Sequence, residues 1–200
     1  QTFSQAFAFN KYIGDWNVAN VKTLYGTFYE ASSYDMGMNN WNVGRVTSFD
    51  HTFRHASAFS KDIGNWDTSS AVSMSYTLAS AAAFNRALNW DTSKVTNMAG
   101  LFMMATSFNQ ARITSWDVSR VEQMQYLFSG APFNQDVSGW DVRKVANMFA
   151  IVMFNAQFYQ DISPWLSRSN AFSCTGRTYC SYERCCPSIA PSPPPLYWPP

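Results

Sequence analysis

The chain has 200 residues, a net charge of +1, a charged-residue content of 14% and an aromatic content of 17%. This length accommodates one domain with a sizeable core, and so many aromatic residues with so few charges exclude a disordered chain or a coiled coil. The nearly neutral balance argues against nucleic acid or an anionic membrane as a partner, and no run of about 18 apolar residues is present to span a bilayer.

Tryptophan recurs at a nearly constant step along most of the chain. Successive members lie 24 to 26 positions apart in the series Trp16, Trp41, Trp66, Trp90, Trp116, Trp140 and Trp165. Repetition at this period indicates structural units that cannot bury their apolar side alone and therefore stack on one another. We predict about seven stacked coils of about 25 residues each over residues 1–166.

The first residues of the chain already match the end of a repeat. Phe3, Ala6 and Phe9 occupy the F-x-x-A-x-x-F positions that later units also carry. A repeat stack normally needs a capping unit at each end, and an open edge readily pairs with another chain. We therefore expect either further repeats ahead of Gln1 or another molecule that covers this edge.

The first half of each unit, around its tryptophan, is predicted to be a strand of about four to six residues. Residues 63–68, with the sequence IGNWDT, are an example. They are short and rich in β-forming types, with small or polar residues between the apolar ones. In a stack, such strands would pair in parallel as one sheet.

The second half of each unit is predicted to be a short helix. Its apolar residues recur at i, i+3, i+7 and i+10, which is one face of an α-helix. In the first unit these residues are Val21, Leu24, Phe28 and Ala31. Asp with Ser or Thr just ahead of this pattern, as at residues 67–69, is typical of a helix N-cap.

Together the two halves predict an α/β solenoid. It would be a leucine-rich-repeat-like right-handed coil with one short parallel strand and one short helix per unit. The seven tryptophans would stack inside as a core ladder. The residues that directly follow tryptophan would form an Asn/Asp ladder at one end of the strands: Asn17, Asn42, Asp67, Asp91, Asp117 and Asp141.

The repeat resembles a known family. Residues 133–142 read FNQDVSGWDV and residues 145–148 read VANM, which is similar to the 25/26-residue repeat of bacterial surface proteins. That family is similar to the BspA-like leucine-rich-repeat proteins and occurs in mycoplasma surface lipoproteins, algae and protists. The resemblance covers residues 3–165 and implies a cell-surface or secreted repeat protein. It supplies no catalytic residues.

The carboxyl-terminal part differs in composition from the repeats. All four cysteines lie within residues 167–186, and a Pro-rich stretch occupies residues 187–200. Clustered cysteines in a short segment predict a disulfide-stapled cap and an oxidising compartment; zinc binding or free thiols are the alternatives. The cysteines are Cys174, Cys180, Cys185 and Cys186, and their pairing stays open. The Pro-rich stretch predicts an extended spacer or linker.

Residues suited to chemistry are few. His51 and His55 lie four apart on a predicted helix, and Glu30 occupies the place of His55 one unit earlier, so these three are the candidates for a metal site. A solvated helix face is the favoured interpretation, so neither a metal nor a cofactor is predicted. The Asp ladder offers oxygens for calcium, but a role in capping or in bonding neighbouring backbones is favoured. No nucleophile elbow, P-loop or dinucleotide motif is present.

These observations predict a protein that is not an enzyme. The favoured hypothesis is an extracellular or cell-surface structural subunit of a surface layer, wall or filament, which self-associates or contacts other surface or matrix proteins. The alternative is an adhesion module that recognises a protein or glycan. Tyrosines on the predicted outer helices are candidates for partner contacts: Tyr25, Tyr29, Tyr76 and Tyr126.

Overall fold

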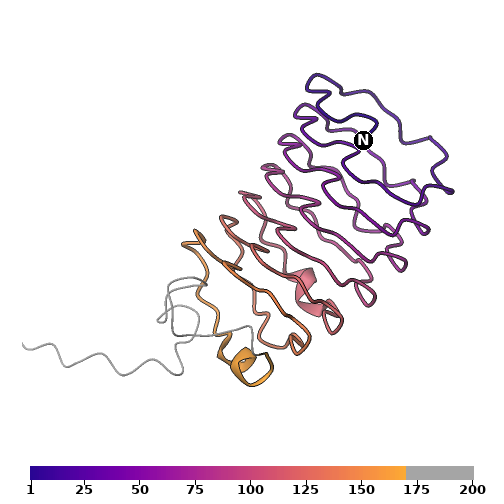
Figure 1. Cartoon of the computed structure of the whole chain (residues 1–200). Coiled ribbons are helices and arrows are strands. Elements are labelled where there is room, and N and C mark those ends of the chain that lie inside the picture. The colour runs from indigo at the N-terminus through magenta and orange to yellow at the C-terminus, as the bar shows by residue number, and fades with distance from the viewer. Residues whose placement is uncertain (170–200) are drawn as a thin grey trace, which may run out of the picture.

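The computed structural model describes residues 1–169, which form a row of stacked coils. The coils follow one another in chain order from the amino-terminal end of the stack to the other (Figure 1). Hydrogen bonds join equivalent backbone groups of successive coils: the Leu24 N–H donates to the Ser48 carbonyl at 2.9 Å, and the Phe49 N–H donates to the Ser73 carbonyl at 2.9 Å. Each coil is therefore held by the next one.

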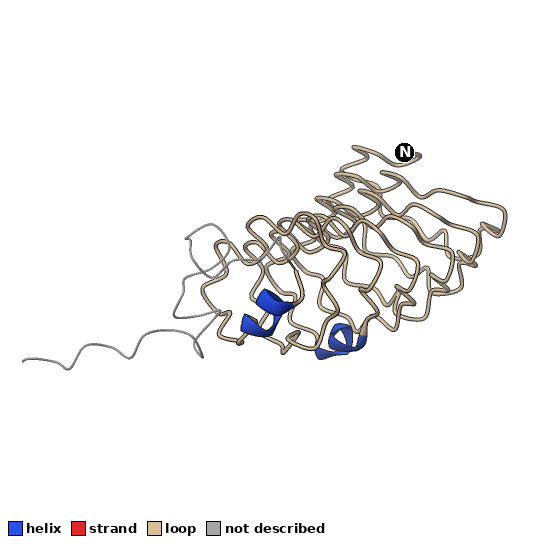
Figure 2. Cartoon of the chain, turned by 60° about the horizontal axis from the view of Figure 1, so that its bottom comes forward, coloured by secondary structure: helices blue, strands red, loops and turns tan. Residues whose placement is uncertain are grey.

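Regular secondary structure is sparse in residues 1–169. The helices are two short 3-10 helices, η1 (Ala111–Ser115) and η2 (Ser163–Ser167), which lie along one edge of the stack (Figure 2). Parallel pairing between coils is limited to five isolated bridges. The residues that form them are Thr23, Ser48, Ser73, Asn97, Gln123 and Asn147.

The predicted helix in each coil is wrong. In the first coil, the N–H groups of Gly26 and Phe28 donate to carbonyls of the next coil, whereas those of Thr27 and Ala31 donate to carbonyls three residues earlier. An α-helix would instead direct each N–H to the carbonyl four residues earlier. Gly26 also has a φ of 55° and Glu30 a φ of 58°, so the segment is a run of tight turns with left-handed residues.

The predicted strand is wrong as well. Within residues 63–71 the Trp66 N–H donates to the Ile63 carbonyl and the Ala71 N–H donates to the Thr68 carbonyl, so the chain turns repeatedly. The bridging residue of this coil is Ser73, which lies between the two halves of the repeat. The predicted leucine-rich-repeat-like α/β solenoid with a parallel sheet is therefore corrected to a stack of turn-rich coils joined by single bridges.

The one inserted segment of the repeat has a structure of its own. Residues 111–115 add length before Trp116, and they form η1 instead of widening a loop. The side chain of Ile113 is buried and takes the place that Ile63 and Leu88 occupy in earlier coils. The insertion is thus absorbed at the edge of the stack without interrupting the core.

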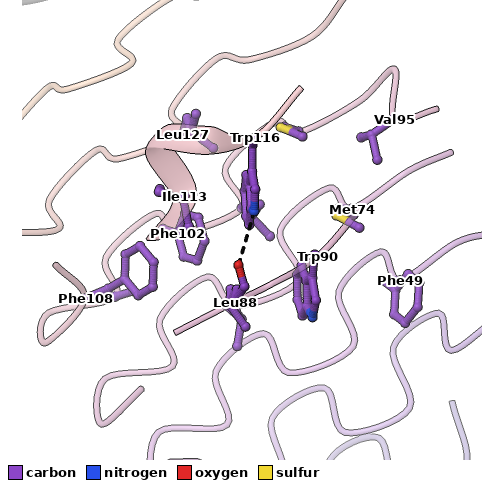
Figure 3. Packing of buried hydrophobic residues seen from close by; sticks show 14 of the residues in the cluster. Phe49, Met74, Leu88, Trp90, Val95, Phe102, Phe108, Ile113, Trp116 and Leu127 are labelled. Carbon is purple, nitrogen blue, oxygen red and sulfur yellow. Dashed lines mark hydrogen bonds between the residues drawn. The ribbon is translucent and has the colours of Figure 1, made fainter. Parts of the chain in front are cut away.

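Aromatic side chains form columns through the stack. Indoles of neighbouring coils stack nearly parallel in three pairs, as in Trp90 and Trp116 with ring centroids 6.1 Å apart and an interplanar angle of 5°. Within a coil two phenylalanines stack on each other, as in Phe102 and Phe108 at 3.8 Å. Figure 3 shows these columns around Trp90 and Trp116. Burial of such large side chains supplies the main favourable term of folding.

The indoles also join neighbouring coils by hydrogen bonds. The Trp116 Nε1–H donates to the Leu88 carbonyl at 3.3 Å (Figure 3), and the Trp66 Nε1–H donates to the Met38 carbonyl at 3.1 Å. The bond recurs at Trp41, Trp90, Trp140 and Trp165. A buried indole N–H needs a partner, so the same residue fills the core and fixes the register between coils.

Candidate functional site

Six of the seven predicted ladder tryptophans are buried, and the first is not. Trp41 is 5% exposed, whereas Trp16 is 52% exposed, so the prediction of a core position is corrected for Trp16. The reason is positional: residues 1–9 cover only part of the first coil and leave its indole uncovered. Trp16 contacts the Phe3 ring, with the centroids 5.7 Å apart.

Trp16 borders a groove on the amino-terminal face of the stack. The groove has a volume of about 490 Å³, and its apolar lining includes Phe3, Val21, Leu24 and Trp41. We call this surface, formed by residues 1–27 on the outer side of the first coil, the amino-terminal face. It exposes the surfaces that neighbouring coils bury between them elsewhere in the stack.

The predicted Asn/Asp ladder does not join neighbouring coils. Each member accepts a hydrogen bond from the backbone N–H two residues later, as Asp67 does from Ser69 at 3.1 Å and Asp91 from Ser93 at 2.9 Å. The same local bond is made by Asn17, Asn42, Asp117 and Asp141. These residues therefore close an Asx-turn after each tryptophan, which is a local role.

A ladder of side-chain hydrogen bonds between coils exists at a different repeat position. This position directly follows the aromatic residue that recurs before the tryptophan of each coil. The Asn109 side-chain oxygen accepts a hydrogen bond from the backbone N–H of Asn134 at 3.0 Å, and Asn134 in turn accepts one from Tyr159 at 2.9 Å. Asn10, Asp35 and Asn85 act in the same way. The recurring Phe-Asn pair is the sequence signal for this ladder, which the prediction placed after tryptophan instead.

The metal candidates do not form a metal centre. No group of three or more potential metal ligands is present within residues 1–169. His51 has a φ of 57° and His55 a φ of 61°, so each is the third residue of a tight turn and not part of a helix face. Glu30 lies near His55, and its carboxylate also raises the pKa of the neighbouring Tyr29.

The histidines belong instead to a cluster of planar side chains on the turn edge of the first three coils. His51 stacks on Tyr76, with centroids 5.3 Å apart and an interplanar angle of 9°, and meets Tyr25 edge-on at 5.6 Å. Arg54 lies between two rings, 5.1 Å from the Tyr76 centroid and 5.8 Å from that of Tyr29. Of the four predicted contact tyrosines, Tyr25 is exposed and the other three are half-buried.

Arg54 determines the protonation state of His51. The Arg54 Nη1 and the His51 Nδ1 are 3.3 Å apart, and because a guanidinium only donates, His51 accepts through Nδ1 and is neutral. Burial and the nearby Arg54 lower the pKa of His51, and the same two causes lower that of His55. Asp50 and Glu30 oppose these shifts without reversing them.

These shifts predict a loss of stability on mild acidification. Because the folded-state pKa values of His51 and His55 lie below those of the unfolded chain, the unfolded chain binds more protons, and the free energy of unfolding falls from about pH 7 to about pH 5. Urea unfolding at several pH values measures this. His51→Asn, which keeps a residue tolerant of positive φ, should flatten the slope. Stability that is constant or rises over this range contradicts the prediction.

The four cysteines of the predicted disulfide cap, Cys174 to Cys186, lie outside the described residues, as does the Pro-rich stretch. Within residues 1–169 no helix is long and apolar enough to cross a membrane.

Comparison with known proteins identifies the repeat family. A family model described as "Mycoplasma protein of unknown function, DUF285" matches the chain twice in tandem, over residues 1–89 and 87–176. No curated protein and no solved structure matches. The two matches together cover most of the chain, and the chain therefore belongs to the DUF285 family.

Proposed function

We propose that this protein is a non-catalytic structural subunit of an extracellular or cell-surface layer, wall or filament, and that it acts by self-association. The observation that carries the proposal is the half-exposed Trp16 over the apolar groove of the amino-terminal face. An exposed apolar patch of this kind marks an interaction surface in soluble proteins. The proposed surface location rests on the resemblance of the repeat sequence to BspA-like surface proteins. It does not rest on a leucine-rich-repeat geometry.

The backbone of the amino-terminal face matches a further coil of the repeat as its partner, whether that coil precedes Gln1 or belongs to a second copy. Within residues 1–169, no amide donates to the carbonyls of Thr23 and Tyr25, whereas the equivalent carbonyls of Ser48 and Asp50 each accept an amide from the coil before. The Lys22 N–H likewise has no acceptor there, although the Thr47 N–H donates to the Lys22 carbonyl. The face thus offers donors and acceptors in the register of the repeat, as an exposed strand edge does.

A coil of a second copy can pair with this face as successive coils pair within the stack, where the amides of Leu24 and Gly26 donate to the carbonyls of Ser48 and Asp50. Such a head-to-tail contact repeats without closing unless a rotation closes it. Self-association through this face would therefore extend as a filament or layer.

Trp16→Ser tests the proposal directly. We expect the 200-residue chain to increase in mass with concentration in size-exclusion chromatography with light scattering, and Trp16→Ser to shift it to the monomer, because the substitution removes an apolar anchor. Met104→Gln is the matched control, since Met104 is 46% exposed but lies in the middle of the stack. A wild-type monomer at all concentrations, or an unchanged assembly in Trp16→Ser, would overturn the proposal.

An adhesion module is the second candidate function. The Tyr–His–Arg cluster favours it, because the repeat position of His51 and Tyr76 varies between coils and is occupied by Gly26, Gly100, Tyr126 and Ala150 in the others. Surface positions that vary over a repeated core are where repeat proteins place their contacts. A monomer whose binding to a surface partner is lost on substitution of Tyr76 would favour this function.

A further inference from the structure

Cationic side chains recur at one repeat position along the edge of the later coils. Lys94, Arg120 and Lys144 each lie four residues after the tryptophan of their coil, in three consecutive coils, and all three are exposed. Backbones of parallel-bonded neighbours are about 4.8 Å apart, so this edge carries one positive charge per coil at a regular spacing. We call these three residues the cation row.

No member of the cation row forms an ion pair within 4.0 Å in the described part of the chain, although the charge of Lys94 acts on the carboxylates of Asp67 and Asp91. Ion pairs within 4.0 Å there are limited to Lys61 with Asp35 and Arg143 with Asp141. Asp141 is the carboxylate closest in sequence to Lys144, but it is already engaged by Arg143 through contacts of 2.8 and 2.6 Å. The Arg143–Asp141 pair therefore leaves Lys144 without an ion-paired carboxylate, and Arg120, which has Asp117 and Glu122 near it in sequence, also forms no ion pair within 4.0 Å in the described residues.

A groove lies between the last two members of the cation row. It has a volume of about 480 Å³ and is lined by Ser119, Arg120, Asp141, Arg143 and Lys144. Earlier coils carry Ser69 or Ser93 where Arg143 stands, so the groove is a departure from the repeat and not a consequence of it. Its lining combines three cations with one paired carboxylate, which suits an anionic ligand.

We propose that the cation row binds a linear acidic polysaccharide that carries a carboxylate on successive sugars. A regular line of single charges is complementary to a narrow polymer with regularly spaced anions.

An acidic peptide fits this edge less well than a polysaccharide. Four amides around the groove are already bonded: those of Ser119 and Arg143 donate to the Asx-turn oxygens, and those of Val121 and Val145 donate to carbonyls three residues earlier. These four amides are not available to a peptide for strand addition. Carboxylates on a sugar chain need only the side chains of Arg120, Arg143 and Lys144 together with the Ser119 hydroxyl.

The test uses the full chain and polygalacturonate oligosaccharides as the probe, with titration calorimetry at low and high salt. We expect binding that weakens with salt and falls at least about tenfold in Arg120→Gln/Lys144→Gln, because both charges contact the polymer. Arg45→Gln is the matched control, since Arg45 occupies the same repeat position in the second coil but Ser70 interrupts the row after it. Both residues of the double variant are exposed, so thermal unfolding should be unchanged.

Two further probes separate the ligand classes. Poly-glutamate and single-stranded DNA of similar charge should bind more weakly than polygalacturonate. Equal affinity for either would overturn the assignment to polysaccharide in favour of a non-selective charged edge. The proposal also fails if polygalacturonate does not bind, or if Arg45→Gln weakens binding as much as the double variant. None of these outcomes depends on whether the chain self-associates.

Discussion

Phe102→Ala is expected to lower the free energy of unfolding by about 3–5 kcal/mol, the range for emptying a buried phenylalanine site. Phe102 is fully buried, and its ring centroid lies 3.8 Å from that of Phe108 and 5.9 Å from that of Phe128. The substitution therefore removes contacts within one coil and to the next. Each coil is stabilised mainly by its neighbours. Phe102 lies in the middle of the stack, so both neighbouring coils lose contacts when its ring is removed. Urea unfolding followed by tryptophan fluorescence measures the change.

The chain itself provides the control for this prediction. Leu78 fills the same repeat position in the third coil and is also fully buried. Phe102→Leu should therefore cost at most about 2 kcal/mol, since the site accepts a branched aliphatic side chain with modest repacking. Equal losses in the Ala and Leu variants, or a loss below about 1 kcal/mol in the Ala variant, would contradict the assignment of Phe102 to a tightly packed column.

Gly64→Ala is expected to destabilise the chain by about 1–3 kcal/mol, the usual cost of forcing extra atoms into a packed site. A Cβ on Gly64 would collide with the backbone carbonyl of Ala87 in the next coil, and it would also lie 3.1 Å from the Asp62 carboxylate. The collision is with backbone that is itself part of the inter-coil contact, because the Asn89 N–H donates to the Gly64 carbonyl at 3.0 Å. The two coils must separate locally to admit the methyl group.

Gly139→Ala isolates the steric cause. Nothing lies within 4 Å of a Cβ placed on Gly139. Both substitutions reduce the conformational freedom of the unfolded chain equally, so Gly139→Ala should be neutral or stabilising by up to about 1 kcal/mol. Thermal or urea unfolding of the two variants side by side gives the difference. If Gly64→Ala is as well tolerated as Gly139→Ala, the coils are not in close contact at Ala87.

Candidate sites were harder to predict than the core, because they depend on the register between coils. Four-residue spacing placed His51 and His55 on one helix face, but the positive φ of each residue turns them toward Tyr29 and Tyr76 of the neighbouring coils. Arg54 and the two histidines contact rings from three coils. A pattern within one stretch of sequence carries no information about such contacts. The cation row, by contrast, is visible in the sequence once the tryptophan register is used to align the units.

The amino-acid sequence by itself determined the repeat, its period and the apolar positions that fill the columns, because burial of large side chains in every unit requires them to recur at one step. It did not determine the backbone conformation between those positions. Spacings of three and four residues arise from an α-helix and equally from consecutive tight turns. The choice depends on whether the N–H groups of Gly26 and Phe28 bond within their own coil or to Asp50 and Thr52 of the next. That partner is supplied only by stacking, so the tertiary structure decided it.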